Sequence, residues 1–311
     1  MRSAVGIDIG GTKVAGMRVA EDGSVLDRRE RPTPAEDVSA TVEAVTDLAG
    51  ELAAAGGEAV GVGAAGMVDF ASGTLRSAPN LAWREIRLRD LVAERTGLPC
   101  VVDNDANVAA WGEYRFGAAR GYRHALVVTV GTGIGGGIVA DGELFRGAHG
   151  FAAEIGHFIV EPGGPPCGCG NRGCWEQVAS GRALDRAARA EVERDAGGRI
   201  AALAAGAEPS GLHVSEAAGE GAPAAVAIFE VVGRRLGEGI AGLVNILDPE
   251  VVIVGGGVAE VGAVLLEPAR RAFLDAVEAP EHRPEVPILA AALGNDAGAI
   301  GAAALGLDLR P

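Results

Sequence analysis

Apolar runs and short turns alternate over the first 32 residues of the chain. The segment AVGIDIGGTKVAGMRVAEDGSVLDRR follows the order strand, glycine turn, strand, acidic turn, strand, and it predicts a meander. Residues 35–56 place apolar side chains at helical spacing before a Gly-Gly pair, so we expect a helix there. EAVGVGAAGMVDF predicts a strand and a glycine-rich loop, and LPCVVDNDANVAAWGEYRFG predicts a strand that runs into a helix.

The opening pattern returns at residue 125, where ALVVTVGTGIGGGIVADGELF aligns with AVGIDIGGTKVAGMRVAEDG across a one-residue gap. This internal repeat predicts two similar α/β halves that face each other across a cleft. We place the border near residues 117–122, which gives a smaller N-terminal domain over 1–117 and a larger C-terminal domain over 118–295.

The second half is expected to contain helices near 180–205 and 224–245. The segment PEVVIVGGG predicts a strand with a helix behind it. A last helix near 296–311 is expected to pack back on the first domain.

Composition narrows the class of protein. A chain of 311 residues is long enough for two domains, and its richness in Ala and Gly with 4% aromatics favours tight backbone packing. No apolar run reaches the roughly 18 to 20 residues needed to span a bilayer, so we expect a cytoplasmic protein without membrane contact. A net charge of −15 with scattered Arg residues argues against nucleic acid as a partner.

Three glycine-rich loops are the first candidates for chemistry. Gly131, Gly133 and Gly136 satisfy G-x-G-x-x-G, but that dinucleotide motif must open a helix, and GIVADGELF alternates and turns as a hairpin does. No Gly-Lys-Ser or Gly-Lys-Thr is present, so a Walker A loop is excluded as well. What remains are strand-turn-strand loops whose backbone N–H groups can bind a phosphate chain.

We therefore predict nucleotide binding by these loops. A third loop follows the strand VVIV, where glycine would let a base or ribose approach the backbone closely. Each loop taken alone is also compatible with a tight turn. The residues assigned to ATP are Asp8, Gly10, Gly11, Thr12, Lys13, Gly131, Thr132, Gly133, Gly255, Gly256 and Gly257.

Two charged residues of the first loop have particular roles in this prediction. Lys13 is the only lysine in the chain, which suggests a phosphate ligand or a local structural charge. Asp8 is a candidate for holding hydrated Mg²⁺ that accompanies ATP, although a lone Asp in a turn is also common.

Cysteines are few, and three of the four lie within PCGCGNRGCWE, as Cys167, Cys169 and Cys174. In a reduced compartment such a cluster favours a metal site with three soft ligands over a disulfide. A redox pair is the competing interpretation, but a catalytic dithiol more commonly shows C-x-x-C. Cys100 stands in an apolar run and is interpreted as a buried small hydrophobic residue.

The order and spacing of five motifs resemble those of the ROK family of sugar kinases and sugar-responsive repressors. The motifs, which cover most of the chain, are DIGGTK, VVDNDANVAAWGE, TVGTGIGGGIV, HGFAAEIGH and CGCGNRGCWE. Within that family the chain is most similar to the glucose-phosphorylating kinases of actinomycetes. The resemblance implies the actin-like ATPase (ribonuclease H-like) fold and ATP-dependent phosphorylation of glucose at its 6-hydroxyl.

The resemblance also implies roles for individual residues. Asp105 is the expected general base, and its position where a strand passes into a helix would keep the carboxylate ionised, although a plain helix cap would use the same residue types. The sugar-binding residues carried over are Gly66, Asn80, Asn104, Asp105, Glu154, His157 and Glu176. The chain departs from the common family pattern at Ala65, Met67 and Ala153, which leaves the shape of the sugar loops open.

The family places His157 as the fourth ligand of a structural Zn²⁺ with the three cysteines. Imidazole has two nitrogens, so His157 could bind zinc through one and a sugar hydroxyl through the other. Zinc would then hold Glu154, His157 and Glu176 in place. The family also suggests a homodimer or homotetramer built by the second half.

Several alternatives stay open at this point. Another hexose or an N-acylhexosamine would use nearly the same residues, and polyphosphate could replace ATP. A sugar-binding regulatory protein is the alternative from another class. Repressors of the family carry an additional N-terminal helix-turn-helix, whereas here the first phosphate-loop strand begins by about residue 4.

Overall fold

The computed structural model describes residues 2–78 and 83–309, and it contains two compact units. Unit 1 comprises residues 1–127, 136–153 and 292–311, and unit 2 comprises residues 128–135 and 154–291. The domain limits expected from the sequence stay a prediction. Within the described ranges, no helix is both long enough and apolar enough to cross a membrane.

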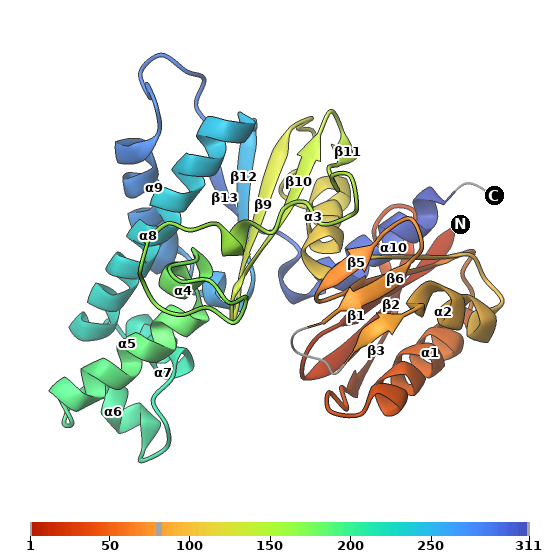
Figure 1. Cartoon of the computed structure of the whole chain (residues 1–311), viewed down its shortest axis with the longest axis horizontal. Coiled ribbons are helices and arrows are strands. Elements are labelled where there is room, and N and C mark those ends of the chain that lie inside the picture. Colours follow the sequence, from red (N-terminus) through yellow and green to blue (C-terminus); the bar gives the residue numbers. More distant parts are fainter. Residues whose placement is uncertain (1, 79–82, 310–311) are drawn as a thin grey trace. The chain divides into compact units, whose positions relative to one another are not determined.

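A five-stranded sheet forms the core of unit 1 (Figure 1), in the order β3-β2-β1-β4-β8. Neighbours β1, β2 and β3 are antiparallel, whereas β1, β4 and β8 run parallel. The predicted meander and the two later strands are thereby confirmed. The strands are β1 (Ser3–Ile9), β2 (Lys13–Ala20), β3 (Val25–Pro32), β4 (Val60–Ala64) and β8 (Cys100–Asn104).

Helices cover the sheet of unit 1, and a separate small sheet belongs to the same unit. The predicted helix at 35–56 is α1, whereas α2 and the antiparallel sheet β5-β6-β7 were not predicted. The remaining elements are α1 (Val38–Ala54), β5 (Met67–Asp69), β6 (Thr74–Ser77), β7 (Arg84–Ile86), α2 (Leu88–Thr96), α3 (Asp105–Phe116) and α10 (Ala297–Asp308).

The C-terminal helix α10 lies so close to its neighbours that only small residues fit between them. A Cβ on Gly61 of β4 would stand 1.7 Å from the carbonyl oxygen of Ala302, and one on Gly6 of β1 would stand 1.9 Å from that of Ala299. Both distances are far inside van der Waals contact. The Ala- and Gly-rich composition therefore reflects backbone-to-backbone packing, as expected from the low aromatic content.

A second five-stranded sheet has the order β11-β10-β9-β12-β13. The two sheets have the same strand order. In each sheet, the strand that comes first along the chain is central, the second and third lie to one side of it, and the fourth and fifth lie to the other. This agrees with the internal repeat. The predicted hairpin is confirmed because β10 and β11 pair in antiparallel fashion. The strands are β9 (Ala125–Val130), β10 (Ile134–Ala140), β11 (Glu143–Leu144), β12 (Val251–Gly255) and β13 (Ile288–Ala290).

Helices make up most of the rest of unit 2. The region predicted as helical over 180–205 contains two helices, with a break at residues 195–198, where Gly198 is the N-cap of the second. The long α8 packs along α9. The helices are α4 (Glu176–Ala179), α5 (Gly181–Arg194), α6 (Arg199–Ala204), α7 (Gly211–Gly219), α8 (Pro223–Leu247) and α9 (Ala263–Ala276), with 3₁₀ turns η1 (Ile155–His157) and η2 (Gly257–Val261) in this unit and η3 (Gly294–Asp296) in unit 1.

Candidate active site

Asn104 and Asp105 stand at the junction of β8 and α3, as the sequence predicts. Asn104 is the N-cap: its Oδ1 accepts from the N–H groups of Ala106 at 2.9 Å and Asn107 at 3.2 Å. This side chain therefore satisfies the free backbone donors of the first helical turn. Asp105 is the first residue of the helix, so the capping role that competed with catalysis belongs to its neighbour.

The Asp105 carboxylate is partly exposed, and its Oδ1 accepts from the backbone N–H of Ala106 at 2.9 Å. Burial nevertheless raises the pKa of Asp105 above its ordinary value, and the bond from Ala106 opposes this only in part. Burial thus opposes the effect that the sequence predicts for the helix N-terminus, and the ionised state of Asp105 stays a prediction. A carboxylate with a raised pKa is the better proton acceptor near neutral pH.

Gly66 and Asn104, both assigned to the sugar, contact each other. The Nδ2 of Asn104 donates to the carbonyl oxygen of Gly66 at 3.1 Å. Gly66 has φ 123°, and a Cβ there would stand 2.2 Å from the carbonyl oxygen of Ser77, so no other residue fits. Because one N–H of the amide holds Gly66, Asn104 keeps its second amide hydrogen for a ligand. Asn80 lies outside the described residues.

Asp8, near the end of β1, shares the electrostatic environment of Asp105. Burial raises the pKa of Asp8 to about 7, the charge of Asp105 adds to this rise, and Lys13 opposes it. The carboxylate also lies against the first turn of α10, where a Cβ on Gly298 would stand 2.5 Å from Oδ2. The charge of Asp105 thus adds to the cost of ionising Asp8, and a divalent cation bound by Asp8 would lower that cost.

The first glycine loop is a tight turn whose ends are fixed to each other. The N–H of Gly10 donates to the carbonyl oxygen of Lys13 at 3.0 Å, while Gly11 and Thr12 are exposed at the tip. Lys13 is also exposed, and its Nζ lies 2.7 Å from Oε1 of Glu30 on β3. The ion pair with Glu30 supports the interpretation of Lys13 as a local structural charge. A role of Lys13 in binding phosphate stays a prediction.

The second glycine loop, between β9 and β10, is fixed to the start of α5. The carbonyl oxygens of Gly131 and Thr132 accept from the N–H groups of Gly181 at 2.8 Å and Arg182 at 3.2 Å. The predicted third loop lies beside this one, since Gly256 has φ 87° and a Cβ there would stand 2.6 Å from the carbonyl oxygen of Val130.

Gly255 ends β12 and Gly257 begins η2, so the three glycines turn the chain out of the sheet. Unit 2 thus brings two of the three predicted loops together.

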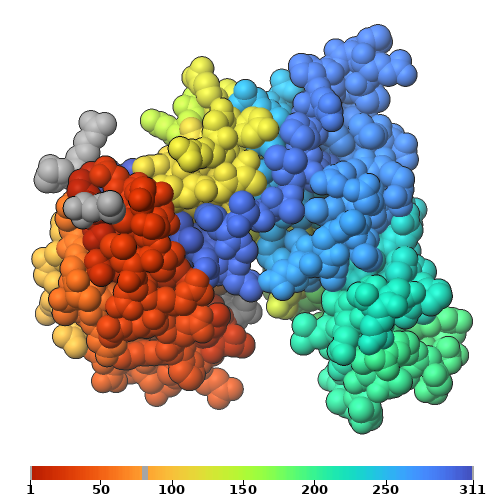
Figure 2. All heavy atoms as spheres, turned by 180° about the vertical axis from the view of Figure 1, so that it is seen from behind, coloured from red at the N-terminus to blue at the C-terminus, as the bar shows by residue number. Residues whose placement is uncertain are grey.

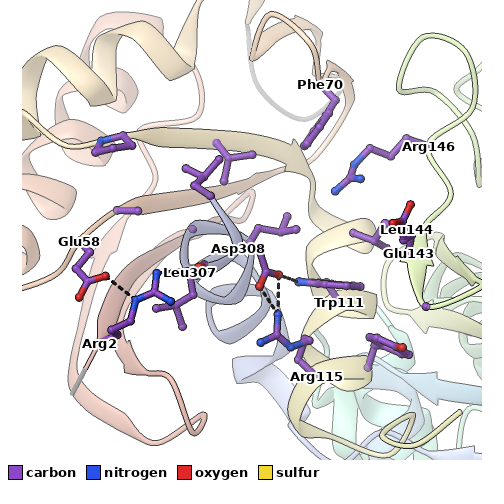
Figure 3. Close-up of a pocket in the computed structure, with 18 residues that line it drawn as sticks. Arg2, Glu58, Phe70, Trp111, Arg115, Glu143, Leu144, Arg146, Leu307 and Asp308 are labelled. Atoms are coloured by element: carbon purple, nitrogen blue, oxygen red, sulfur yellow. Dashed lines mark hydrogen bonds and ion pairs between the residues drawn. The ribbon is translucent and has the colours of Figure 1, made fainter. Parts of the chain in front are cut away.

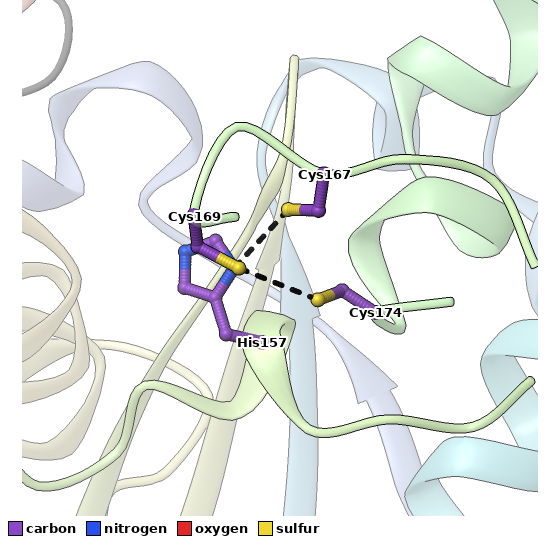
Figure 4. A group of neighbouring side chains, drawn as sticks. All are labelled: His157, Cys167, Cys169 and Cys174. Atoms are coloured by element: carbon purple, nitrogen blue, oxygen red, sulfur yellow. Dashed lines mark hydrogen bonds between the residues drawn. The ribbon is translucent and has the colours of Figure 1, made fainter. Parts of the chain in front are cut away.

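The predicted metal ligands converge in unit 2 (Figure 4). One donor atom from each of His157, Cys167, Cys169 and Cys174 lies within 4.8 Å of every other. All cysteines are free, and the Sγ atoms of Cys169 and Cys174 are 3.6 Å apart, too far for a disulfide. Thiolates bound to one tetrahedral Zn²⁺ at about 2.3 Å would stand about 3.8 Å apart, so the donor set fits a metal ion.

His157 and Glu176 flank this cluster. The Nδ1 of His157 lies 3.6 Å from Sγ of Cys167, which leaves Nε2 free of the cluster. Glu176 begins α4, and its Oε1 lies 3.2 Å from Sγ of Cys167. Its other carboxylate oxygen lies over the second glycine loop, where a Cβ on Gly133 would come within 2.3 Å. Glu154 is exposed immediately before η1, and its carbonyl oxygen accepts from the N–H of His157 at 3.1 Å.

Two α/β sheets of one strand order, with a pair of carboxylates of raised pKa and hairpin glycine loops, are typical of the class of actin-like ATPases. The ROK family pattern matches residues 4–308, so this chain belongs to the ROK family. It is 44% identical over 321 aligned residues to the glucokinase of Streptomyces coelicolor, with 100% of this chain and 99% of that protein covered. It is 38% identical to the glucokinase of Thermotoga maritima, with 97% and 96% covered.

A solved structure agrees with these relatives. The crystal structure of a ROK family glucokinase from Streptomyces griseus in complex with glucose and AMPPNP superposes with a TM-score of 0.89 at 45% identity. The match covers 99% of this chain and 100% of the other. The predicted family and the actin-like ATPase fold are both confirmed.

Proposed function

We propose that this chain is an ATP-dependent hexose kinase that transfers the γ-phosphoryl group of ATP to the 6-hydroxyl of glucose. The observation that carries the proposal is Asp105, a partly exposed carboxylate with a raised pKa that the Asn104 cap leaves available. The complex of the Streptomyces griseus relative with glucose and AMPPNP supports the choice of substrates.

In this reaction Asp105 accepts the proton of the 6-hydroxyl. The electron pair of the sugar oxygen then forms the bond to the γ-phosphorus while the bond to the β,γ-bridging oxygen breaks and ADP leaves. Asp8 would hold the hydrated Mg²⁺ that accompanies ATP and neutralises its phosphates. The glycine loops would contribute backbone N–H groups to the phosphate chain, and Lys13 a positive charge.

We further propose that the cluster of His157 and three cysteines holds a structural Zn²⁺. The set is closed, because four protein ligands leave no position for a reacting water. The ion would fix the segment that carries Glu154, His157 and Glu176, and these groups would bind sugar hydroxyls together with Asn104. His157 would use Nδ1 for the metal and Nε2 for the sugar, in agreement with the side of the ring that meets Cys167.

We also propose a homodimer or homotetramer built by unit 2. The support is that α8 exposes Val226, Val231 and Ile246, three large apolar side chains. Light scattering at several protein concentrations measures the mass directly, and a monomer at all of them would refute this proposal.

The test of function is a coupled ADP-release assay with ATP and Mg²⁺ against glucose, fructose, mannose, N-acetylglucosamine and N-acetylmannosamine. Selective turnover of glucose is expected. Selective turnover of another sugar would keep the mechanism and change the substrate. If no sugar is turned over with ATP, the same panel with polyphosphate distinguishes a different donor from a protein that binds sugar without phosphorylating it.

A further inference from the structure

A carboxylate next to the proposed base is almost completely buried and makes three hydrogen bonds. Asp103, on β8 directly before Asn104, is 1% exposed. Its Oδ1 accepts from the backbone N–H of Asn104 at 2.8 Å and from Nδ2 of Asn107 at 3.0 Å, and its Oδ2 accepts from Nε of Arg146 at 2.7 Å. Asp103 therefore fixes the residue before Asp105 and the first turn of α3 at the same time.

Asn107 depends on this carboxylate for its orientation. Its side chain is 1% exposed, and its Oδ1 has no hydrogen-bond partner among the described residues. The bond from Nδ2 to Asp103 is thus the side-chain hydrogen bond that orients its amide in the structure. Loss of that partner would leave a second buried polar group of Asn107 unsatisfied, in the helix turn that carries Asp105.

Arg146 is the cation that makes the burial of Asp103 tolerable. It comes from the segment after β11, and its guanidinium lies 3.8 Å from the centroid of the Phe70 ring, directly after β5 (Figure 3). The backbone of the same segment is tightly packed, because a Cβ on Gly150 would stand 2.6 Å from the carbonyl oxygen of Val68. Removing one partner of a buried pair leaves the other charge uncompensated.

The surface ion pairs of unit 1 differ from this one. Arg115 pairs with Asp308, for example, and their side chains are 29% and 38% exposed. Exposed pairs contribute little to stability and position nothing precise in their surroundings. The pair Asp103–Arg146 is buried on the carboxylate side and is connected through one backbone N–H to the residue that caps α3.

We propose that Arg146 is a positioning residue for the base: by pairing with Asp103 and stacking on Phe70 it holds Asn104 and Asp105 in the geometry for proton transfer. The proposal rests on the proposed function. It predicts that loss of Arg146 lowers kcat, because a misplacement of about 1 Å at a reacting group can cost about 10²-fold in rate.

The experiment compares Arg146→Ala and Arg146→Lys with the matched control Arg115→Ala, which removes an ion pair at the far end of α3, the helix that begins with Asp105. kcat and the KM values for glucose and ATP are measured well below each melting temperature. We expect kcat of Arg146→Ala to fall about 10- to 100-fold with both KM values within about twofold. Low concentrations of guanidinium should restore part of the kcat that Arg146→Ala has lost. Arg115→Ala should keep the wild-type kcat.

A wild-type kcat in Arg146→Ala, with only its melting temperature lowered, would overturn the positioning role. A lost kcat that guanidinium does not restore would overturn it too. If Arg146→Ala does not fold, Arg146→Lys decides, since it keeps the charge but not the planar contact with Phe70: wild-type kcat there refutes the proposal. A wild-type enzyme that phosphorylates no sugar would instead refute the proposed function, so the two failures are distinguishable.

Discussion

The neighbourhood of Asp105 and the cysteine cluster are built in opposite ways. Asp105 stands between a parallel strand and a helix, and the cap, the strand and Asp103 hold its neighbours by hydrogen bonds of 2.8–3.2 Å. The cluster lies in a segment of irregular chain with two isolated bridges, Ile159 to Cys174 and Pro166 to Arg172. The fold thus preorganises the proposed base, whereas the proposed sugar-binding residues of unit 2 would depend on the proposed ion.

The largest loss of activity is expected for Asp105→Asn, which keeps the shape of the side chain and removes its basicity. We expect kcat to fall by about 10² to 10⁴, the usual contribution of general-base catalysis, while glucose binding persists. Steady-state kinetics and calorimetric titration with glucose measure the two effects. Asp37→Asn is the control, since Asp37 also stands at the start of a helix, as the N-cap of α1, and Asn caps equally well. A near-normal kcat would remove Asp105 from the mechanism.

Loss of the metal should affect the other region. Cys169→Ser removes one soft ligand, so we expect loss of Zn²⁺, a lower melting temperature and glucose binding weaker by about 10- to 100-fold. Metal content by atomic emission and the same glucose titration measure this. Cys100→Ala, which removes the cysteine outside the cluster, should keep the metal. A variant without metal that binds glucose as the wild type does would show that the ion does not organise the sugar site.

The sequence predicts the backbone elements around Asp105, but it does not predict the long-range contacts that surround them. The β8–α3 junction and the meander are local patterns, and both are found where expected. The pair Asp103–Arg146 joins residues 43 positions apart. Glu113 accepts from the N–H groups of Ala292 and Leu293, about 180 positions away. Periodicity carries no signal for such contacts, because they join residues far apart in the chain.

A smaller effect should appear in the pH dependence of stability. The pKa of Asp8 is raised from 3.8 to about 7, so between these values the folded chain binds a proton that the unfolded chain has released. Stability therefore falls as pH rises through this window. Asp8→Asn does not titrate, and its melting temperature should exceed that of the wild type by more at about pH 8 than at about pH 5.

Asp22→Asn is the control of opposite sign for this experiment. The Ser24 hydroxyl and its N–H lower the pKa of Asp22 in an exposed turn, so this carboxylate favours the folded state when ionised. Its replacement should bring no gain at high pH. A melting-temperature difference for Asp8→Asn that does not change with pH would mean that Asp8 is ionised in the folded chain at little cost.

The smallest effect compares two alanines with left-handed backbone. Ala153, directly before Glu154, has φ 67°, and Ala205, at the end of α6, has φ 49°. Glycine adopts this region without strain, so Ala153→Gly and Ala205→Gly should each stabilise the fold by about 1 kcal/mol, or about 2 °C in melting temperature. If Ala153 helps to place Glu154, only Ala153→Gly should also change the KM for glucose. Equal gains in stability with unchanged KM would mean that the backbone before Glu154 tolerates either residue, and that the ion alone governs this side of the sugar site.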